Sequence, residues 1–301
     1  MEKTLIVVQG PTGIGKSSLS IQLAKHFKTE IISADSRQIF RELSIGTAVP
    51  TPDELNQAPH HLIHSHSIHD DYNASRFESD ALDLIASCFT KQDMLVMTGG
   101  SMLYVDAVCK GIDEQPDVDH EIREKLTRDF EEKGIEHLRM KLKQLDASYY
   151  QQVDLKNPKR LIRALEVCLM TGKPYSSFRK ETIKERPFKI LKIGLNMERE
   201  KLYNQINKRV DLMMAAGLEE EARSIYPFKH LNSLNTVGYK ELFAYFDGET
   251  SLEKAVELIK RNSRRYARKQ LTWLRKDPDI HWFEPHQQEE IICFIHETLK
   301  T

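Results

Sequence analysis

Eight consecutive residues near the N-terminus have the spacing of a phosphate-binding loop. They follow an apolar run, Leu5–Val8, and they are Gly10, Pro11, Thr12, Gly13, Ile14, Gly15, Lys16 and Ser17. Glycine tolerates backbone angles that other residues resist, so the backbone N–H groups of such a loop can converge on phosphate oxygens. Lys16 adds a positive charge, and the Ser17 hydroxyl can ligate Mg²⁺. The spacing predicts a site for a polyphosphate and Mg²⁺, without saying which molecule carries the phosphates.

A single acid, Asp35, stands at the end of the second expected strand. Nucleotide-hydrolysing enzymes with this kind of loop usually place an Asp after another apolar strand, where it holds Mg²⁺. The candidate strand here, Met94–Met97, instead runs into Thr98, Gly99 and Gly100. Asp35 should share the carboxyl edge of the sheet with the phosphate loop, where it could be the general base for an acceptor. The alternatives are that Asp35 caps a turn or binds Mg²⁺ through water.

The elements that must position these residues alternate between strands and helices. Strand patterns cover Leu5–Val8, Glu30–Asp35 and Met94–Gly100, and helical patterns cover Ser17–Phe27 and Ala74–Phe89. Such alternation favours a mainly parallel sheet covered by helices on both faces. We therefore predict an α/β fold whose core resembles that of the P-loop nucleotide-binding proteins.

A helical insertion interrupts this pattern. Strand signals stop after Gly111 and return only at Phe188–Asn196, and the chain between them is helical from Asp113 to Glu132. A further helix should begin with Asn157 as cap and end at Gly172.

We expect two parts: a core of residues 1–114 and 186–301, and an all-helical insertion of residues 115–185. The final part of the core should be helical. Its last long helix is expected to begin with a capping box formed by Thr250 and Glu253.

Composition is that of an ordinary globular protein. The 301 residues carry a net charge of −1, and the four cysteines are widely spaced. This spacing argues against a disulfide framework or a Cys-based zinc site. No apolar run approaches the ~18 residues that a membrane helix needs. We expect a soluble, cytoplasmic monomer without a membrane partner.

Positive charge is concentrated in two helical stretches. Arg160 and Arg163 lie on the helix after Asn157, and we expect them to face away from its apolar residues. A second set follows helical spacing near the C-terminus: Arg261, Arg264, Arg265 and Arg268. A solvated face is the usual explanation of such a stripe, but two of them in a neutral protein favour an RNA-binding surface.

Five histidines gather in the segment from residue 60 to residue 69: His60, His61, His64, His66 and His69. They lack the fixed helical spacing or the cysteines of a zinc site. We assign them no metal role.

Several motifs together resemble those of the tRNA dimethylallyltransferases. Read in order they are GPTGIGKS, ADSRQIFRELSIGTAVPTPDEL, PHHLI, TGGSMLY, NPKRLIRALEV and RVDLMMAAGLEEE with NTVGYKE. The resemblance covers nearly the whole chain. It implies an enzyme that transfers the dimethylallyl group of dimethylallyl diphosphate to the exocyclic amine of adenosine 37 in tRNA, with an insertion that grips the anticodon stem-loop.

The resemblance also implies roles for particular residues. The phosphate loop would hold the diphosphate with Mg²⁺ on Ser17, Lys16 would stabilise the leaving diphosphate, and Asp35 would accept the proton of the attacking amine. Thr12 would act with Asp35 and Lys16 in catalysis, and Thr12 and Ser101 would line the route of the extruded base. The implied tRNA-binding set is Asp35, Ser36, Arg37, Gln38, Ser101, Lys159, Arg160 and Arg163.

Arg209 completes the candidate site. It follows the returning strand and should lie near the carboxyl edge of the sheet, where its guanidinium could bind the diphosphate in bidentate fashion. The alternative is a surface arginine paired with Asp211 or Glu220.

Two other functions use part of the same features. A small-molecule kinase needs the phosphate loop and Asp35 but no RNA surface, whereas a non-catalytic RNA-binding protein with a structural nucleotide needs no base. Only the prenyl transfer reaction uses all of these features.

Overall fold

A six-stranded parallel sheet forms the centre of the protein. The computed structural model describes residues 2–113, 116, 119–179 and 182–300. Within these residues the strand order is β3-β2-β4-β1-β5-β6, and every neighbouring pair is parallel. The strands are β1 (Thr4–Gln9), β2 (Ile31–Ser33), β3 (His60–His61), β4 (Met94–Thr98), β5 (Lys189–Leu195) and β6 (Ile280–Phe283). This arrangement confirms the predicted α/β class.

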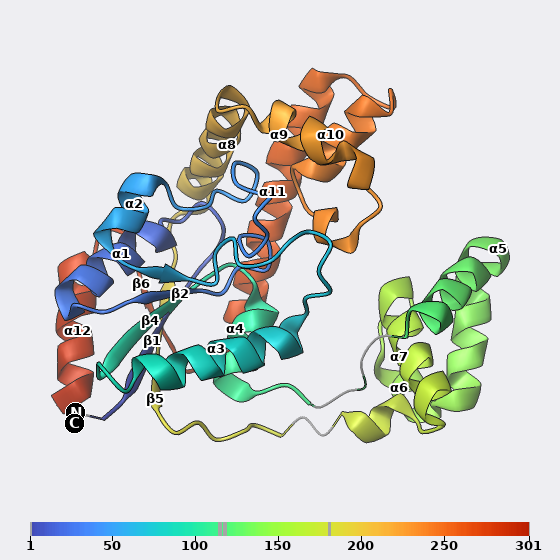
Figure 1. The fold of residues 1–301 in the computed structure, drawn as a ribbon, viewed down its shortest axis with the longest axis horizontal. Helices are drawn as coiled ribbons and strands as arrows, with labels where there is room; N and C mark the ends of the chain where they lie inside the picture. Colours follow the sequence, from blue (N-terminus) through green and yellow to red (C-terminus); the bar gives the residue numbers. More distant parts are fainter. Residues whose placement is uncertain (1, 114–115, 117–118, 180–181, 301) are drawn as a thin grey trace. The chain divides into compact units, whose positions relative to one another are not determined.

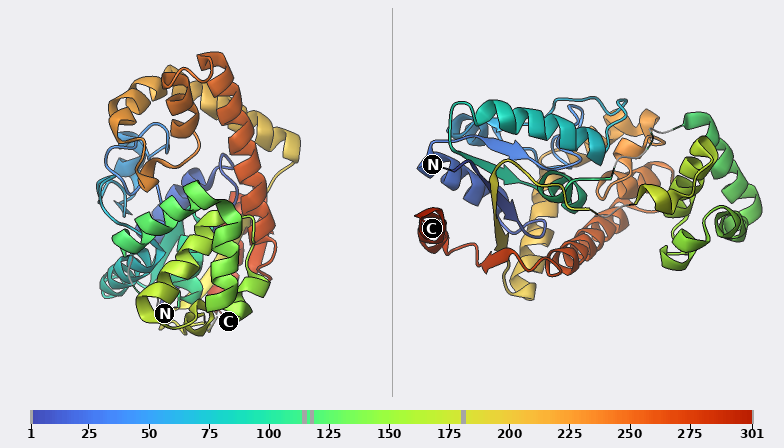
Figure 2. Two further views of the ribbon diagram at one scale, coloured as in Figure 1. Left: turned by 90° about the vertical axis from the view of Figure 1, so that its right-hand side faces the viewer. Right: turned by 90° about the horizontal axis from the view of Figure 1, so that it is seen from below.

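Both faces of the sheet are covered by helices. Leu5 and Val7 of β1 pack with α3 (Ala74–Cys88) and α4 (Met102–Lys110). Ile6 and Val8 point to the other face, where α1 (Lys16–Phe27) and α12 (Gln288–Lys300) lie (Figures 1 and 2). Because side chains alternate along a strand, a strand buried on both faces reads as a continuous apolar run.

Four helices follow β5 and surround a separate apolar cluster. They are α8 (Arg199–Ala215), α9 (Leu218–Ile225), α10 (Tyr239–Phe246) and α11 (Leu252–Leu274). Fully buried Tyr239 and Leu218 lie in this cluster with Leu43, which comes from the loop after β2. Two 3₁₀ turns, Tyr226–Phe228 and Asn232–Leu234, complete this part of the chain, and the short helix α2 (Pro52–Gln57) lies between β2 and β3.

The chain divides into two compact units. One consists of Met1–Cys109 with Glu185–Thr301, and the other is Lys110–Lys184. The second unit contains α5 (His120–Leu145), α6 (Ala147–Gln152), α7 (Pro158–Thr171) and a 3₁₀ turn, Tyr175–Phe178. It has an apolar core of its own, which includes Leu138, Leu142 and Leu161. None of the described helices has the length and apolar character needed to cross a bilayer.

Local sequence signals set most helix ends. The Asn157 side chain accepts a hydrogen bond from the Arg160 N–H, and α7 ends at Gly172 with φ 67°. Both features agree with the sequence prediction, because an Asn cap satisfies a free N–H and glycine adopts a positive φ readily.

Three predictions about elements were wrong. The helix expected from Asp113 begins at His120, where the Asp119 carboxylate caps it; residues 114, 115, 117 and 118 of that prediction lie outside the described residues. The cap of α11 is Ser251, whose hydroxyl accepts from the Lys254 N–H, and not Thr250. The C-terminal part of the core is not all helical, since β6 adds an edge strand beside β5.

Candidate active site

The phosphate loop connects β1 to α1 through backbone that excludes larger residues. A Cβ on Gly10 would lie 2.9 Å from the carbonyl oxygen of Leu195, and a Cβ on Gly13, where φ is 79°, would lie 3.0 Å from the Ile206 side chain. The loop is thus fitted closely against the end of β5 and against α8. Ile14 is buried, so its side chain serves the core and only its backbone is available to a ligand.

Lys16 is folded back over its own loop. Its ammonium donates to the carbonyl oxygens of Gly10 (3.0 Å) and Pro11 (2.9 Å). Burial, followed by the nearby positive charge of Arg209, lowers the pKa of Lys16 to about 8, although Asp35 opposes this effect. The positive charge of Lys16 is therefore not fully neutralised by the surrounding residues, and a bound diphosphate would supply the missing negative charge.

Asp35 organises the turn that follows β2. Its Oδ1 accepts from the N–H groups of Arg37 (2.9 Å) and Gln38 (3.4 Å). No described residue donates to Oδ2. Asp35 thus caps the turn through Oδ1, as the alternative interpretation expected, and Oδ2 remains available as a proton acceptor.

The turns after β2 and β4 are joined by several hydrogen bonds. The Ala34 N–H donates to the Thr98 carbonyl (2.7 Å), and the Ser36 N–H donates to Ser101 Oγ (2.8 Å). Gly99 allows this approach, because a Cβ there would lie 2.1 Å from the Ala34 carbonyl oxygen. Asp35 and Ser101 are consequently held on one rigid edge, as the parallel sheet predicts.

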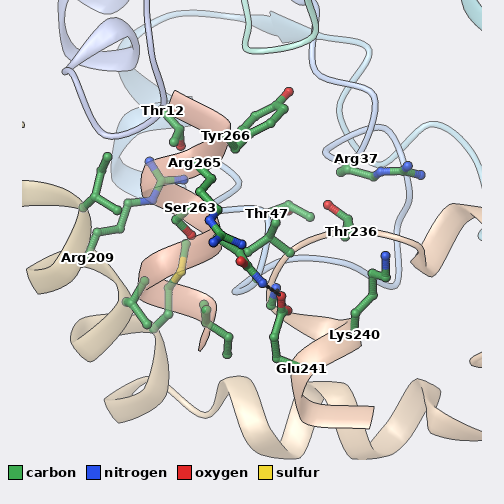
Figure 3. A pocket seen from close by; sticks show the side chains of 18 of the residues that line it. Thr12, Arg37, Thr47, Arg209, Thr236, Lys240, Glu241, Ser263, Arg265 and Tyr266 are labelled. Carbon is green, nitrogen blue, oxygen red and sulfur yellow. Dashed lines mark hydrogen bonds between the residues drawn. The ribbon is translucent and has the colours of Figure 1, made fainter. Parts of the chain in front are cut away.

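One pocket brings several of the predicted residues together. It has a volume of about 520 Å³ and is lined by Thr12, Asp35, Ser36, Arg37, Ser101 and Arg209, together with residues of the helices after β5. Thr12, Arg37 and Arg209 are labelled in Figure 3. Thr12 is the one phosphate-loop residue in the pocket lining, which does not include Lys16 or Ser17. Further cations in its wall are Lys240, Arg265 and Lys269. The carboxylate of Glu241, also in the wall, is engaged by the Gly238 N–H and the Asn262 side chain. The pocket therefore favours an anionic ligand.

Arg209 lies inside the site and not in a surface ion pair. It belongs to α8, lines the pocket, and its pKa is lowered by burial while Asp35 raises it. Asp211, one of the partners considered for it, pairs with Lys260 of α11. Among the described residues neither Asp211 nor Glu220 forms an ion pair with Arg209.

Two of the residues expected to bind tRNA also hold the fold. Arg37 donates to the Ser233 carbonyl (2.8 Å), and burial lowers its pKa. The Gln38 amide donates to the carbonyls of Thr47 (3.2 Å) and Ala48 (3.0 Å) and accepts from the Ser33 hydroxyl. Gln38 is absent from the pocket wall, so its side chain supports the site without facing it.

The basic residues of α7 differ in their surroundings. Arg160 is exposed, as expected, and Lys159 is exposed as well. Arg163 instead donates to the Pro116 carbonyl (2.7 Å) and lies 3.2 Å from Glu166, whose side chain is fully buried. The prediction that Arg163 faces away from the packed side was wrong, because a buried carboxylate on that helix requires a cation beside it.

The C-terminal basic stripe is likewise divided. Arg265 lines the pocket, whereas the Arg264 guanidinium donates to Asn207 of α8.

Sequence reasoning missed Lys240, Tyr266, Lys269 and Gln270, although helical spacing from Arg265 would place Lys269 on the same helix face as Arg265. Gln270 carried no signal of its own.

The histidine segment is fixed by separate local contacts. A ring nitrogen of His60 bonds the Ala58 carbonyl (2.8 Å), and His61 bonds Glu30 directly (2.5 Å). The Cys88 sulfur lies 3.6 Å from the Glu30 carboxylate. The side chains of Glu30, His61 and Cys88 therefore bring potential ligand atoms within 4.8 Å of one another. The direct contact between His61 and Glu30 is a hydrogen bond that ties β3 to the start of β2.

The oxygen groups at the phosphate loop suit a hard divalent cation. Ser17 offers an exposed hydroxyl at the start of α1. Mg²⁺ prefers oxygen donors and commonly takes its remaining ligands from water and substrate phosphates. Ser17 therefore fits a phosphate-bound Mg²⁺.

Comparisons with known proteins identify the family. The sequence profile described as IPP transferase matches residues 38–277. The chain belongs to the IPP transferase family. The tRNA dimethylallyltransferase 1 of Phocaeicola vulgatus is 55% identical to this IPP transferase over 296 residues, which is 98% of this chain and 99% of the relative. The resemblance drawn from the motifs is thus confirmed.

Solved structures agree with this assignment. The tRNA isopentenylpyrophosphate transferase of Bacillus halodurans has a TM-score of 0.72 and 36% identity to this IPP transferase, covering 100% of this chain and 97% of the other. A eukaryotic dimethylallyltransferase acting on tRNA has a TM-score of 0.77 and 25% identity, covering 94% of this chain and 74% of the other. The P-loop-type core predicted from the sequence is confirmed by this likeness.

Proposed function

We propose that this chain transfers the dimethylallyl group of dimethylallyl diphosphate to the N6 amine of adenosine 37 in tRNA and releases diphosphate. The observation that carries the proposal is a pocket that is lined by Thr12 of the phosphate loop, by Asp35 and by Arg209. A phosphate loop facing a carboxylate is suited to a reaction in which a diphosphate leaves and an acceptor loses a proton. The family relatives carry transferase names, so nothing among them favours the kinase interpretation.

The diphosphate is assigned to the phosphate loop. Lys16, the backbone N–H groups of the loop and Arg209 would bind its oxygens, and their attraction strengthens as negative charge grows on the leaving group. Ser17 would hold Mg²⁺, which supplies further neutralisation of that charge. The Lys16 ammonium already lies within the loop, so little movement is needed for it to reach the diphosphate.

The acceptor amine is assigned to the Asp35 side of the pocket. N6 attacks the first carbon of the dimethylallyl group, the bond from that carbon to the diphosphate oxygen breaks, and the amine proton passes to Asp35 Oδ2. The Thr12 side chain, in the pocket wall, would orient the amine. The reacting amine must enter this pocket, so adenosine 37 must leave the anticodon stack. That step costs a few kcal/mol and is least costly in a single-stranded loop.

The cations in the pocket wall are assigned to the RNA backbone beside the extruded base. Arg37, Lys240, Arg265 and Lys269 line the pocket, and phosphate contacts position a nucleic acid without reading its sequence. On the helical unit, exposed Lys159 and Arg160 would contact the anticodon stem-loop. We further propose that the protein acts as a monomer in the cytoplasm.

The position of the acceptor tests the proposal. Unmodified tRNA and the same tRNA with guanosine at position 37 would be incubated separately with labelled dimethylallyl diphosphate and Mg²⁺. We expect label in the first tRNA and none in the second. Equal labelling of both would contradict the assignment to adenosine 37, and labelling of neither would contradict the proposed function.

A further inference from the structure

Gln270 of α11 connects two turns that carry different parts of the proposed chemistry. Its side chain is 1% exposed. The amide oxygen accepts a hydrogen bond from the Thr12 N–H (2.8 Å), and the amide nitrogen donates to the Gly100 carbonyl oxygen (2.8 Å). One planar group thus spans the phosphate loop after β1 and the turn after β4.

The turn at Gly100 also holds Asp35 in place. The Ser101 N–H donates to the Ala34 carbonyl (3.3 Å), and Gly99 packs closely against the Ala34 backbone, so the turn after β4 cannot shift against the turn after β2. A Cβ on Gly100 would lie 3.7 Å from Asp35 Oδ2. Displacement of the Gly100 turn would therefore move the carboxylate oxygen that is proposed to accept the proton.

We propose that Gln270 is a positioning residue that sets the distance between the phosphate loop, which holds the departing diphosphate, and the Asp35 carboxylate, which receives the proton. The inference rests on the proposed function. Gln270 acts through Thr12 and Gly100, and it does not touch the reacting atoms. Reactions of this kind depend on near-ångström alignment, and a 1 Å displacement can cost about 10²-fold in rate.

The chemistry of the side chain explains why glutamine suits this place. An amide presents one acceptor and one donor in a fixed plane, and the two backbone groups here are one donor and one acceptor. A carboxylate would place two oxygen atoms toward the site and would repel the Gly100 carbonyl. A thioether of similar length would fill the space but leave the Thr12 N–H without its partner. The Gly100 carbonyl would then keep only the hydrogen bond from the Tyr266 hydroxyl (2.9 Å).

Three variants separate positioning from general stability. Gln270→Met removes both hydrogen bonds, and Gln270→Glu keeps the acceptor for the Thr12 N–H but loses the donor. Ser251→Ala removes the N-terminal cap of the same helix far along the chain from Gln270, and it weakens α11 without altering either turn. Thermal unfolding, kcat, the KM for each substrate and tRNA affinity would be measured for all three and for the wild-type protein.

We expect Gln270→Met to unfold cooperatively, to bind tRNA normally and to lose about 10²-fold in kcat. Gln270→Glu should recover part of that loss, and it carries the test if the Met variant does not fold. Ser251→Ala should lose thermal stability with kcat within about 2-fold of wild type, since a cap affects stability locally.

Two results would overturn the inference. One is a folded Gln270 variant with wild-type kcat, and the other is an equal loss of kcat in Ser251→Ala at a matched loss of stability. The wild-type control keeps the two proposals apart. A wild-type protein that transfers no dimethylallyl group refutes the proposed function, whereas an active wild type with equally active Gln270 variants refutes only the positioning role.

Discussion

The guanidinium of Arg163 lies 3.2 Å from the carboxylate of Glu166, whose side chain is fully buried within the helical unit. Arg123 contacts the same carboxylate (2.5 Å), and the Asp119 N–H donates to its other oxygen (3.0 Å). Arg163 therefore belongs to an internal charge network, whereas Lys159 and Arg160 are exposed cations on the same helix.

This difference gives a paired prediction for α7. Arg163→Ala should lower the free energy of unfolding of the helical unit by about 1–3 kcal/mol, because Arg123 alone then neutralises the buried carboxylate. Arg160→Ala should leave stability almost unchanged. Chemical denaturation of the two variants makes the comparison, and equal stabilities would show that the Arg163 contact contributes nothing.

The two exposed cations of α7, Lys159 and Arg160, test the RNA surface. Combined replacement of Lys159 and Arg160 by Ala should weaken tRNA binding and leave dimethylallyl diphosphate binding intact. Each lost phosphate contact should reduce the slope of log affinity against log salt by about 0.7–0.9. Binding isotherms at several salt concentrations measure this slope. A tRNA affinity that the replacement and the salt both leave unchanged would exclude a phosphate-binding role for α7.

Lys16 should give the reaction a characteristic pH dependence. Its pKa in the free protein is lowered to about 8. The side chain is therefore positively charged below that pH, and it loses its proton and its charge as the pH rises above it. Since kcat/KM reports the free enzyme, kcat/KM for dimethylallyl diphosphate should fall above about pH 8. The corresponding limb in kcat should lie at higher pH, because the bound diphosphate favours the charged form.

Two substitutions check that this limb belongs to Lys16. Lys16→Arg keeps its charge at all these pH values and should remove the limb. Lys16→Ala should worsen both KM and kcat, since the charge contacts the diphosphate before and during its departure. An unchanged alkaline limb in Lys16→Arg would assign the titration to another group.

Asp35 has two oxygens with different tasks. Asp35→Asn retains an oxygen that can accept from the Arg37 N–H, so the turn should persist while the proton acceptor is lost. We expect a loss of about 10²–10⁴-fold in kcat with both substrates still bound. Near-normal turnover would mean that the residue only caps the turn. Asp35→Ala, which removes both functions, should show lower thermal stability than Asp35→Asn.

Arg209 should contribute to diphosphate affinity. Its place in the pocket wall and its electrostatic coupling to Lys16 put it close to the phosphate loop. Arg209→Ala should raise the dissociation constant for dimethylallyl diphosphate, and Arg209→Lys should restore it only in part, because a bidentate guanidinium contact cannot be reproduced by an ammonium. Calorimetric titration measures both. Lys201→Ala, on the exposed part of α8, is the matched control and should bind as the wild type does.

The features that sequence reasoning could predict are those encoded by neighbouring residues. The phosphate loop, the Asn157 cap and the buried strands each depend on side chains within a few positions of one another. The place of Asp35 followed from one further rule, that parallel strands end at a common edge.

The features that it missed depend on contacts between distant segments. The hydrogen bond between Gln270 and the Thr12 N–H joins residues 258 positions apart, and no local pattern distinguishes Gln270 from a solvated glutamine. Arg163 was misassigned because helical spacing does not show that Glu166, a charged residue, is buried. The strand β6 has four residues, two of them exposed, and pairs only at the edge of the sheet.

Competing label transfer tests the central claim most directly. Wild-type protein, Mg²⁺ and unmodified tRNA would receive either dimethylallyl diphosphate labelled in its carbon chain or ATP labelled in its γ-phosphate, and nucleosides would be analysed after digestion. We expect carbon label on the N6 of adenosine with release of diphosphate, and no phosphoryl label in any acceptor. Phosphoryl transfer from ATP with no carbon label in tRNA would contradict the proposed prenyl transfer.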